Sequence, residues 1–177
     1  WPADVYYADI NGTWTDAAVT SEVATDPRHR NVPGDGKLDQ SLIPTDVELQ
    51  TGRVDFANMP AFALSEIELT RQYLDKNHAF RHKLFEWDER GLIDDNFGYF
   101  SGEAFAASGF KSISPLVGPE NVYTGDYFTD LNDSSYLWSY GCGGGWYQGA
   151  GGIGNTGDFA AGQTQSVFTI LFGSYFG

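Results

Sequence analysis

Residues 135–146 constrain the fold of this chain most, because an apolar and aromatic run leads directly into glycines. The first half, Ser135–Tyr140, has the composition of a buried β-strand. The second half, Gly141–Trp146, contains four glycines and the only cysteine of the chain, Cys142. Glycines let the backbone approach a ligand closely, and ligands of open α/β sheets bind at the carboxyl ends of the strands. We therefore expect any functional site to lie at the end of this strand.

Strands and short helices are expected to alternate along the chain, which predicts an α/β sandwich with a mostly parallel sheet. Ser65 and Glu68 have the spacing of a capping box, which predicts a helix from there to about His82. A short helix closed by Gly109 and a later helical turn are also expected, over residues 103–108 and 126–131. The predicted strands cover residues 4–10, 47–54, 90–97, 135–140 and 166–172.

The length of 177 residues and the hydrophobic content of 41% are sufficient for one well-buried domain. We expect a single domain over residues 1–177, with an acidic, loop-rich segment over 1–46 and an α/β core over 47–177. The chain begins at Trp1, its only methionine is Met59, and it ends shortly after an apolar run. We therefore expect a processed product or a piece of a larger protein.

The formal net charge of −14 argues against several classes of partner. Lys111 is the last basic residue, and the 66 residues after it contain no Lys, Arg or His. Nucleic acids and anionic membrane surfaces are bound through Lys and Arg, so neither is an expected partner, whereas a divalent cation is. No apolar run approaches the ~18 residues of a membrane span, and a single cysteine cannot form an intrachain disulfide.

The acidic segment predicts a calcium site, because it alternates Asp and Asn with turn-forming Gly. Loops of this kind gather several oxygen atoms around one hard cation. Neither of the two stretches, 9–16 and 31–39, has the full EF-hand pattern. Turns also use Asp, Asn and Gly, so the alternative interpretation is a set of Asx turns. The predicted Ca²⁺ ligands are Asp9, Asn11, Asp16, Asp35 and Asp39.

Two pairs of ionisable residues leave a chemical and a structural interpretation open. His78 and His82 lie four residues apart on the predicted helix, with Asp75 one turn earlier. This spacing can hold a transition metal but lacks the Glu of a zincin motif, and we favour surface histidines that complement the helix dipole, which are the more common case near a helix C-terminus. Asp94 and Asp95 follow a predicted strand and could be ligands or acid–base groups. For these two aspartates we favour capping of the following turn.

Residues 149–154 have the pattern G-x-G-x-x-G of dinucleotide-binding loops. That function needs a strand directly before the glycines, a helix directly after them and an acidic residue about twenty positions later. Residues 155–158 are expected to continue as a loop, and the chain ends before any such acidic residue. The sequence therefore does not predict a nucleotide site here.

Cys142 is the candidate nucleophile. A reactive thiolate needs an imidazole or another positive group nearby to lower its pKa. The histidines are His29, His78 and His82, all distant from Cys142 in the sequence. We therefore favour a small buried residue at a strand end, with a catalytic thiol as the alternative.

Several segments resemble the gingipain family of cysteine peptidases, whose catalytic domain is caspase-like. Tyr6–Trp14 resembles the family's Y-Y-x-D-L-[DN]-G-x-W block, and Pro33–Lys37 resembles the D-G-D-G insert behind it. Asp46–Val54 resembles the family's P-E-[IV]-x-[IVL]-G-R-[IL]-P strand, and the helix that ends near Asn77–Phe80 stands where the family has its K-I-[IL]-x-Y-E helix. The resemblance implies a caspase/gingipain-like sandwich and an extracellular setting, secreted or at the cell surface.

The departures from the family pattern fall on the catalytic residues. In the family, a strand that ends Y-x-G-H-G carries the catalytic His, and here Gly143 stands in the place of that His. The nucleophilic Cys ends the next apolar strand, which here ends Leu171–Ser174 without a cysteine. Loss of both groups removes the thiolate route.

The leading hypothesis is therefore a gingipain-like domain without peptidase activity, which acts as a binding or structural module with a protein or glycan partner. One alternative is a cysteine hydrolase that uses Cys142. Another is a carbohydrate-binding module, because aromatic faces can stack on sugars, although core packing is their commoner use. Its candidate aromatic residues are Trp138, Tyr140, Trp146 and Tyr147.

Overall fold

The computed structural model describes residues 4–17, 25, 30, 32–38, 40, 42–97 and 103–174. By its contacts the chain divides into two units, Trp1–Asp55 and Phe56–Gly177. Each unit is described by itself.

The first unit contains one helix, α1 (Asp4–Ala8), among its described residues. The strand predicted over residues 4–10 is therefore wrong. Its apolar residues are consecutive and do not alternate, a pattern that fits a strand or a helix. The Asp9 amide donates to the Val5 carbonyl at 3.0 Å, which is the i to i−4 bond of a helical turn.

Residues 47–54, all of which are described, also form no strand. An ion pair and two backbone hydrogen bonds hold this segment beside α1. Arg53 Nε lies 2.6 Å from Asp4 Oδ1, and the amides of Glu48 and Leu49 both donate to the Ala8 carbonyl at 3.1 Å. Because one carbonyl accepts both amides, no strand ladder can form there.

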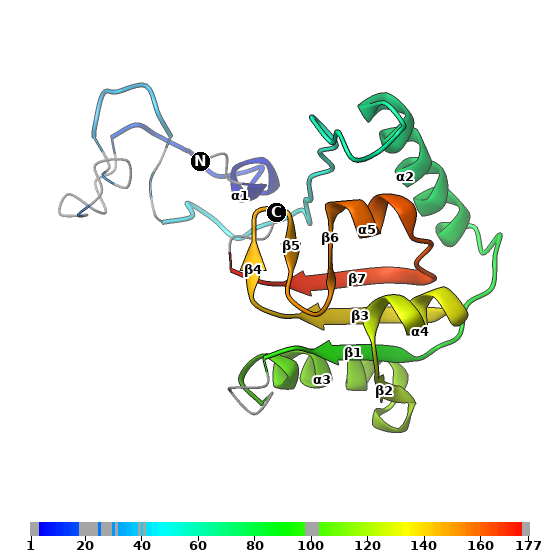
Figure 1. Ribbon diagram of the computed structural model, residues 1–177. Helices are drawn as coiled ribbons and strands as arrows, with labels where there is room; N and C mark the ends of the chain where they lie inside the picture. The colour runs from blue at the N-terminus through cyan, green and yellow to red at the C-terminus, as the bar shows by residue number, and fades with distance from the viewer. Residues whose placement is uncertain are drawn as a thin grey trace. The chain divides into compact units, whose positions relative to one another are not determined.

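In the second unit, four parallel strands of the described chain form a sheet in the order β2-β1-β3-β7 (Figure 1). Their bounds are β1 (Gly91–Asp95), β2 (Val122–Thr124), β3 (Tyr136–Cys142) and β7 (Ser166–Phe172). The predicted mostly parallel α/β sheet with short helices is confirmed, and its last strand has the predicted bounds.

Helices pack on both faces of this sheet (Figure 1). One face carries α3 (Glu103–Val117) and the other carries α4 (Tyr127–Asp133). The buried cluster that includes α3 consists of Ile93, Phe97, Ala106, Ile113, Tyr140 and Cys142. The buried cluster that includes α4 consists of Leu92, Tyr127, Leu131, Tyr136, Ala150 and Ile153.

Helix α2 (Glu66–Arg81) confirms the predicted capping box. Ser65 Oγ accepts from the Glu68 amide, and Glu68 Oε2 accepts from the Ser65 amide at 2.9 Å. Asp126 is the N-cap residue of α4, and its Oδ1 accepts from the Thr129 amide at 2.8 Å. Local sequence therefore sets where these two helices begin.

Helix α3 is longer than predicted and continues through Gly109 and Pro115. A Cβ on Gly109 would lie 2.8 Å from Ile93 Cδ1 and from Tyr140 Cδ1. Gly109 is therefore the residue that lets α3 approach the sheet, and it does not end the helix.

The glycine-rich stretch forms a small antiparallel sheet of β4 (Gly145–Trp146), β5 (Gly149–Ala150) and β6 (Gly154–Asn155). Helix α5 (Thr156–Ala161) follows at once, so the loop expected over residues 155–158 is wrong. Asn155 and Asp158 form a capping box, which is the local cause of this helix. The helix follows an antiparallel hairpin and not a parallel strand, so the context of a dinucleotide fingerprint is still not met.

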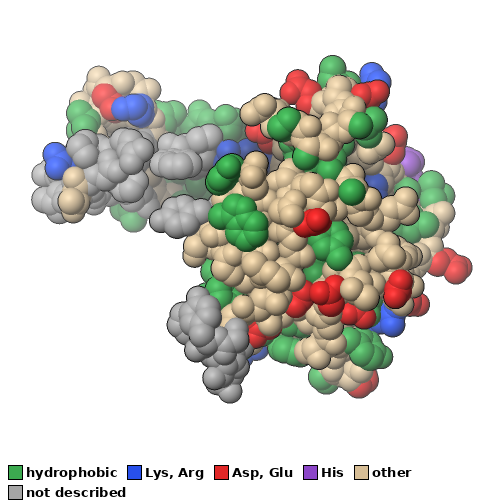
Figure 2. Space-filling view, viewed as in Figure 1, with side chains coloured by type: hydrophobic (Ala, Val, Ile, Leu, Met, Phe, Trp, Pro, Cys, Tyr) green, Lys and Arg blue, Asp and Glu red, His purple; other side chains and the backbone are tan. Residues whose placement is uncertain are grey.

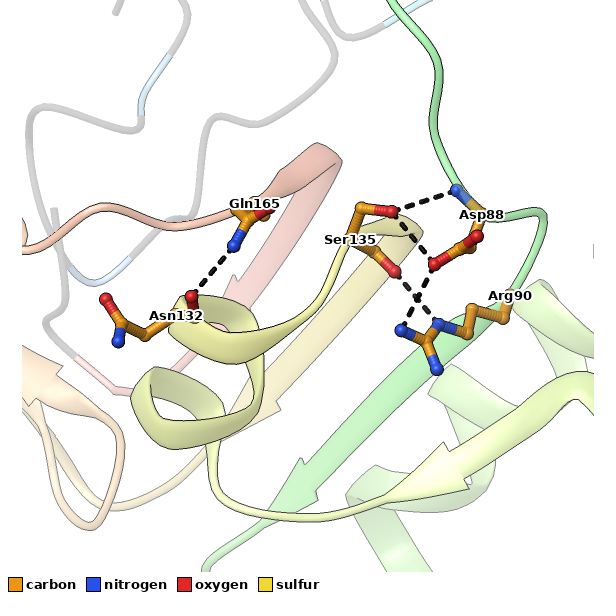
Figure 3. Close-up of polar contacts among 5 residues, drawn as sticks. All are labelled: Asp88, Arg90, Asn132, Ser135 and Gln165. Carbon is orange, nitrogen blue, oxygen red and sulfur yellow. Dashed lines mark hydrogen bonds and ion pairs between the residues drawn. The ribbon is translucent and has the colours of Figure 1, made fainter.

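Polar contacts hold the amino-terminal ends of β1 and β3 together (Figure 3). Ser135 Oγ accepts from the Asp88 amide at 3.0 Å, and Arg90 Nε donates to the Ser135 carbonyl at 2.9 Å. The Arg90 guanidinium also lies 4.2 Å from the centre of the Tyr136 ring and 3.2 Å from Asp88 Oδ2. In Figure 3 a separate bond joins Gln165 Nε2 to the Asn132 carbonyl, at 2.8 Å. These contacts are structural, and the chemistry-bearing residues lie at the opposite ends of the strands.

None of the helices that the structure describes is both long enough and apolar enough to cross a bilayer.

Candidate functional site

The carboxyl ends of β1 and β3 bring Asp95 and Cys142 together. The two residues are partners in the parallel register, and Cys142 Sγ donates to Asp95 Oδ1 at 3.3 Å. The side chain of Cys142 is completely buried. Burial, followed by the hydrogen bond to Asp95 and its negative charge, raises the pKa of the Cys142 thiol to about 12. The thiol is therefore protonated at neutral pH.

Asp94 points to the other face of the sheet and caps helix α4. Its Oδ2 accepts from the Tyr127 amide at 2.8 Å, and its Oδ1 accepts from Asn96 Nδ2 at 2.7 Å. Burial raises the pKa of Asp94, and the two hydrogen bonds oppose that shift. Asp95 caps the turn after β1, because its Oδ1 also accepts from the Phe97 amide at 3.1 Å. Both aspartates therefore accept hydrogen bonds from backbone amides of the segments that follow, as the capping interpretation of Asp94 and Asp95 predicts.

The structure gives Cys142 a carboxylate neighbour and no imidazole among the histidines that it describes. His78 lies on the last turn of α2 and His82 is the C-cap residue of that helix; their ring centroids are 4.1 Å apart. Neither of them hydrogen-bonds to Cys142, whose thiol donates to Asp95. His29 lies outside the described residues. A carboxylate beside a thiol disfavours the thiolate, so Asp95 cannot serve as the activating group.

The two strand ends that the gingipain resemblance singles out, at Gly143 and over Leu171–Ser174, lie side by side. Gly143 follows β3 and Gly173 follows β7, and these two strands are neighbours in the sheet. The Gly143 amide donates to the Phe172 carbonyl at 3.1 Å. The sequence analysis found Gly143 at one strand end and no cysteine at the other, and the tertiary structure brings the two ends to the same edge of the sheet.

Backbone atoms occupy the space that side chains would need at these positions. A Cβ on Gly143 would lie 2.0 Å from the Gly151 carbonyl oxygen. A Cβ on Gly173 would lie 3.0 Å from the Gly143 oxygen, and a Cβ on Gly145 would lie 2.6 Å from the Gly173 carbonyl carbon. We call Gly143, Gly145, Gly151 and Gly173 the glycine cluster. It packs backbone against backbone: an added Cβ would overlap backbone atoms at Gly143 and Gly145 and would make tight contacts at Gly151 and Gly173.

The glycine-rich loop also covers the end of β1. A Cβ on Gly152, whose φ is +78°, would overlap the Asn96 side chain. In the sheet, β2 lies on one side of β1 and β3 lies on the other, so the strand order reverses at β1. Ligands of open α/β sheets bind at the carboxyl ends of the strands beside such a reversal. In this chain, glycine backbone lies over that point.

Two of the predicted calcium ligands, Asp9 and Asn11, lie in one group of contacts. The Asp9 carboxylate is buried and accepts from the Thr45 hydroxyl and amide. Asn11 Nδ2 donates to Glu48 Oε1 at 2.8 Å, and Glu48 Oε2 accepts from the Ile10 amide. The sequence reasoning did not select Thr45 and Glu48 as partners of these residues, because both lie far from Asp9 in the chain.

Two other predicted calcium ligands, Asp16 and Asp35, lie in a second group of hydrogen-bonded residues. Asp16 Oδ2 accepts from the Gly36 amide at 2.6 Å, and the Asp16 carbonyl accepts from the Gly34 amide. Asp35 pairs with Lys37, and hydrogen bonds from Lys37 lower the pKa of Asp35. Asp39 lies outside the described residues. Within the described ranges, no three His, Cys, Asp or Glu side chains converge as metal ligands do.

The four candidate aromatic residues do not form one platform. Trp138 stacks on Phe168 with centroids 4.6 Å apart, and Tyr140 is buried with its hydroxyl donating to the Phe105 carbonyl at 3.1 Å. Trp146 and Tyr147, by contrast, are 43% and 75% exposed at the end of β4. On the face seen in Figure 2, acidic side chains gather over and beside α4, and Lys and Arg are sparse.

Comparison with protein-family models, with curated proteins and with solved structures gives no significant match to this chain. The gingipain resemblance therefore rests on the motif residues alone.

Proposed function

We propose that this chain is a gingipain-like α/β domain without peptidase activity, which serves as a binding or structural module of a secreted or cell-surface protein. The observation that carries the proposal is the glycine cluster. It includes Gly143, which stands where the resemblance would require a catalytic His, and Gly173, which lies in the strand end that holds no Cys. It leaves no room for a side chain at Gly143.

The arrangement of the strands supports the comparison with a caspase-like fold. β3 and β7 are parallel neighbours, so residues that follow them meet at one edge, as a His and a Cys acting together would have to. A domain with glycine in place of the His, and with no Cys at the end of the next strand, retains the scaffold of such a site and lacks its base and its nucleophile.

A hydrolase that uses Cys142 is the alternative, and the surroundings of the thiol argue against it. Cys142 is buried and donates to a carboxylate, and its pKa is raised. Activated thiols have the opposite surroundings, with a positive neighbour and solvent access.

A hydrolysis assay tests the proposal. We expect the chain and its Cys142→Ala variant to release product from fluorogenic peptides and from p-nitrophenyl esters at the same background rate. Hydrolysis that is saturable in the parent chain and lost in Cys142→Ala would contradict the proposal and establish the hydrolase.

The acidic N-terminal segment is proposed to bind Ca²⁺. We expect EDTA to lower the melting temperature by about 5 °C and added Ca²⁺ to restore it, since a ligand that binds only the folded state stabilises it. Differential scanning fluorimetry measures this effect. Asp16→Asn and Asp35→Asn should reduce it, whereas Asp75→Asn, outside the segment, should not. A melting curve that EDTA leaves unchanged would count against the site.

Glycan binding is a second candidate, favoured by the exposure of Trp146 and Tyr147. Adjacent exposed aromatic rings at the end of a hairpin are available for stacking, unlike the packed ring of Trp138. A glycan array tests this candidate: binding by the parent chain that is lost in the Trp146→Ala variant would support it. An array without signal would dismiss it.

A further inference from the structure

The C-terminal end of α2 presents two histidines, His78 and the C-cap residue His82, on the side that faces away from the sheet. Phe80, on the same helix, packs edge-on against Phe168 of β7, and Lys76 Nζ donates to the Ser166 carbonyl at 3.1 Å. His78 and His82 are each two residues further along, a rotation of about 200° around the helix axis. Both are exposed, and histidine is visible at the surface beside α2 in Figure 2.

The backbone that carries the two histidines is well defined. The His82 amide donates to the His78 carbonyl at 3.0 Å, so the helical turn between them is closed. Lys83 then takes a φ of +53°, and the Leu84 amide donates to the Ala79 carbonyl at 2.9 Å, which ends the helix. The relative position of the two Cβ atoms is therefore fixed by a complete turn, and contacts of Lys76 and Phe80 anchor that turn to the sheet.

The two imidazoles already lie together. Their ring centroids are 4.1 Å apart, with an angle of 37° between the planes. Two nitrogens that bind one tetrahedral metal ion at about 2.1 Å lie about 3.4 Å from each other. Small rotations about the side-chain bonds bring nitrogens of these rings to that separation, so little ordering is needed on binding.

We propose that His78 and His82 form a two-nitrogen chelating site for a borderline transition-metal ion, Cu²⁺ or Zn²⁺. Imidazole nitrogen suits these ions, whereas Ca²⁺ prefers oxygen ligands, so the site is separate from the proposed calcium site. In the part of the chain that the structure describes, no third His, Cys, Asp or Glu joins the pair. The remaining coordination positions are therefore open to water or to a ligand from outside the chain.

Isothermal titration with Cu²⁺ and with Zn²⁺ tests the site. We expect one ion per chain, with Cu²⁺ bound more tightly than Zn²⁺. His78→Ala and His82→Ala should each weaken Cu²⁺ binding at least tenfold. Asp75→Asn, one turn earlier on the same helix, is the matched control and should change the affinity by less than twofold. The electron paramagnetic resonance spectrum of the Cu²⁺ complex should show coupling to imidazole nitrogen.

Both histidines are exposed, so the alanine variants should fold, and circular dichroism verifies this. The proposal is overturned if the double variant binds Cu²⁺ as tightly as the parent chain, or if the spectrum lacks imidazole coupling. It is also overturned if Asp75→Asn abolishes binding, because a carboxylate would then carry the site. The Ca²⁺-dependent melting shift should be the same in parent and double variant, which separates the two metal proposals.

Discussion

Iodoacetamide is expected to alkylate Cys142 about 1000 times more slowly in the folded chain than in the urea-unfolded chain near neutral pH. Only the thiolate reacts, and a pKa of about 12 in place of 9.0 lowers the thiolate fraction by about that factor. Complete burial of the side chain slows the reagent further. Alkylation of Cys142 in the folded chain should also remain slow as the pH rises through 9, the range in which the thiol of the unfolded chain ionises.

Intact-mass spectrometry at a series of times measures both rates, and Cys142→Ala gives the background from other side chains. Asp95→Asn is the informative variant, because it removes the negative charge beside the sulfur and should speed labelling of the folded chain. Labelling of the folded parent chain as fast as that of the unfolded chain would contradict the protonated, buried thiol and would favour the hydrolase.

Replacement of Gly143 by alanine is expected to lower the free energy of unfolding by about 3 kcal/mol or more, because overpacking forces the backbone to move. The added Cβ would lie 2.0 Å from the Gly151 oxygen, a backbone atom that no side-chain rotation can displace. For a chain of this length, this corresponds to a fall in melting temperature of about 6–12 °C.

The neighbouring glycine provides the matched control. A Cβ on Gly144 meets no atom within 4 Å, and Gly144 is exposed. Gly144→Ala should therefore change stability by less than about 0.5 kcal/mol. Urea unfolding followed by tryptophan fluorescence measures both variants. Equal stabilities of the two would show that the glycine cluster is not tightly packed, and the main support for the non-catalytic proposal would be lost.

Several features of this protein were decided by short stretches of sequence. Ser65 with Glu68 predicts the start of α2, because a cap is made within one helical turn, and the helical turn predicted over residues 126–131 lies in α4 with its cap. The apolar run over Ser166–Phe172 predicts β7 with its exact bounds. The absence of Lys, Arg and His after Lys111 is likewise a property of the sequence alone.

Other features depend on partners that are distant in the chain, and sequence reasoning about them failed or was incomplete. Residues 4–10 were predicted as a strand because consecutive apolar residues fit either element, and contacts with residues 48–53 hold them as a helix. Gly109 was predicted to end a helix, but α3 continues through it, and the glycine lies where the helix packs closely against Ile93 and Tyr140.

The candidate site shows the same division. The sequence alone determined that the thiol of Cys142 stands among glycines and that no residue able to act as a base stands beside it in the chain. Only the tertiary structure placed Asp95 against the sulfur and packed Gly143 against Gly151. The physical reason is range: caps and strand propensities act within a few residues, whereas burial, pKa and steric room are set by whichever atoms the fold brings into contact.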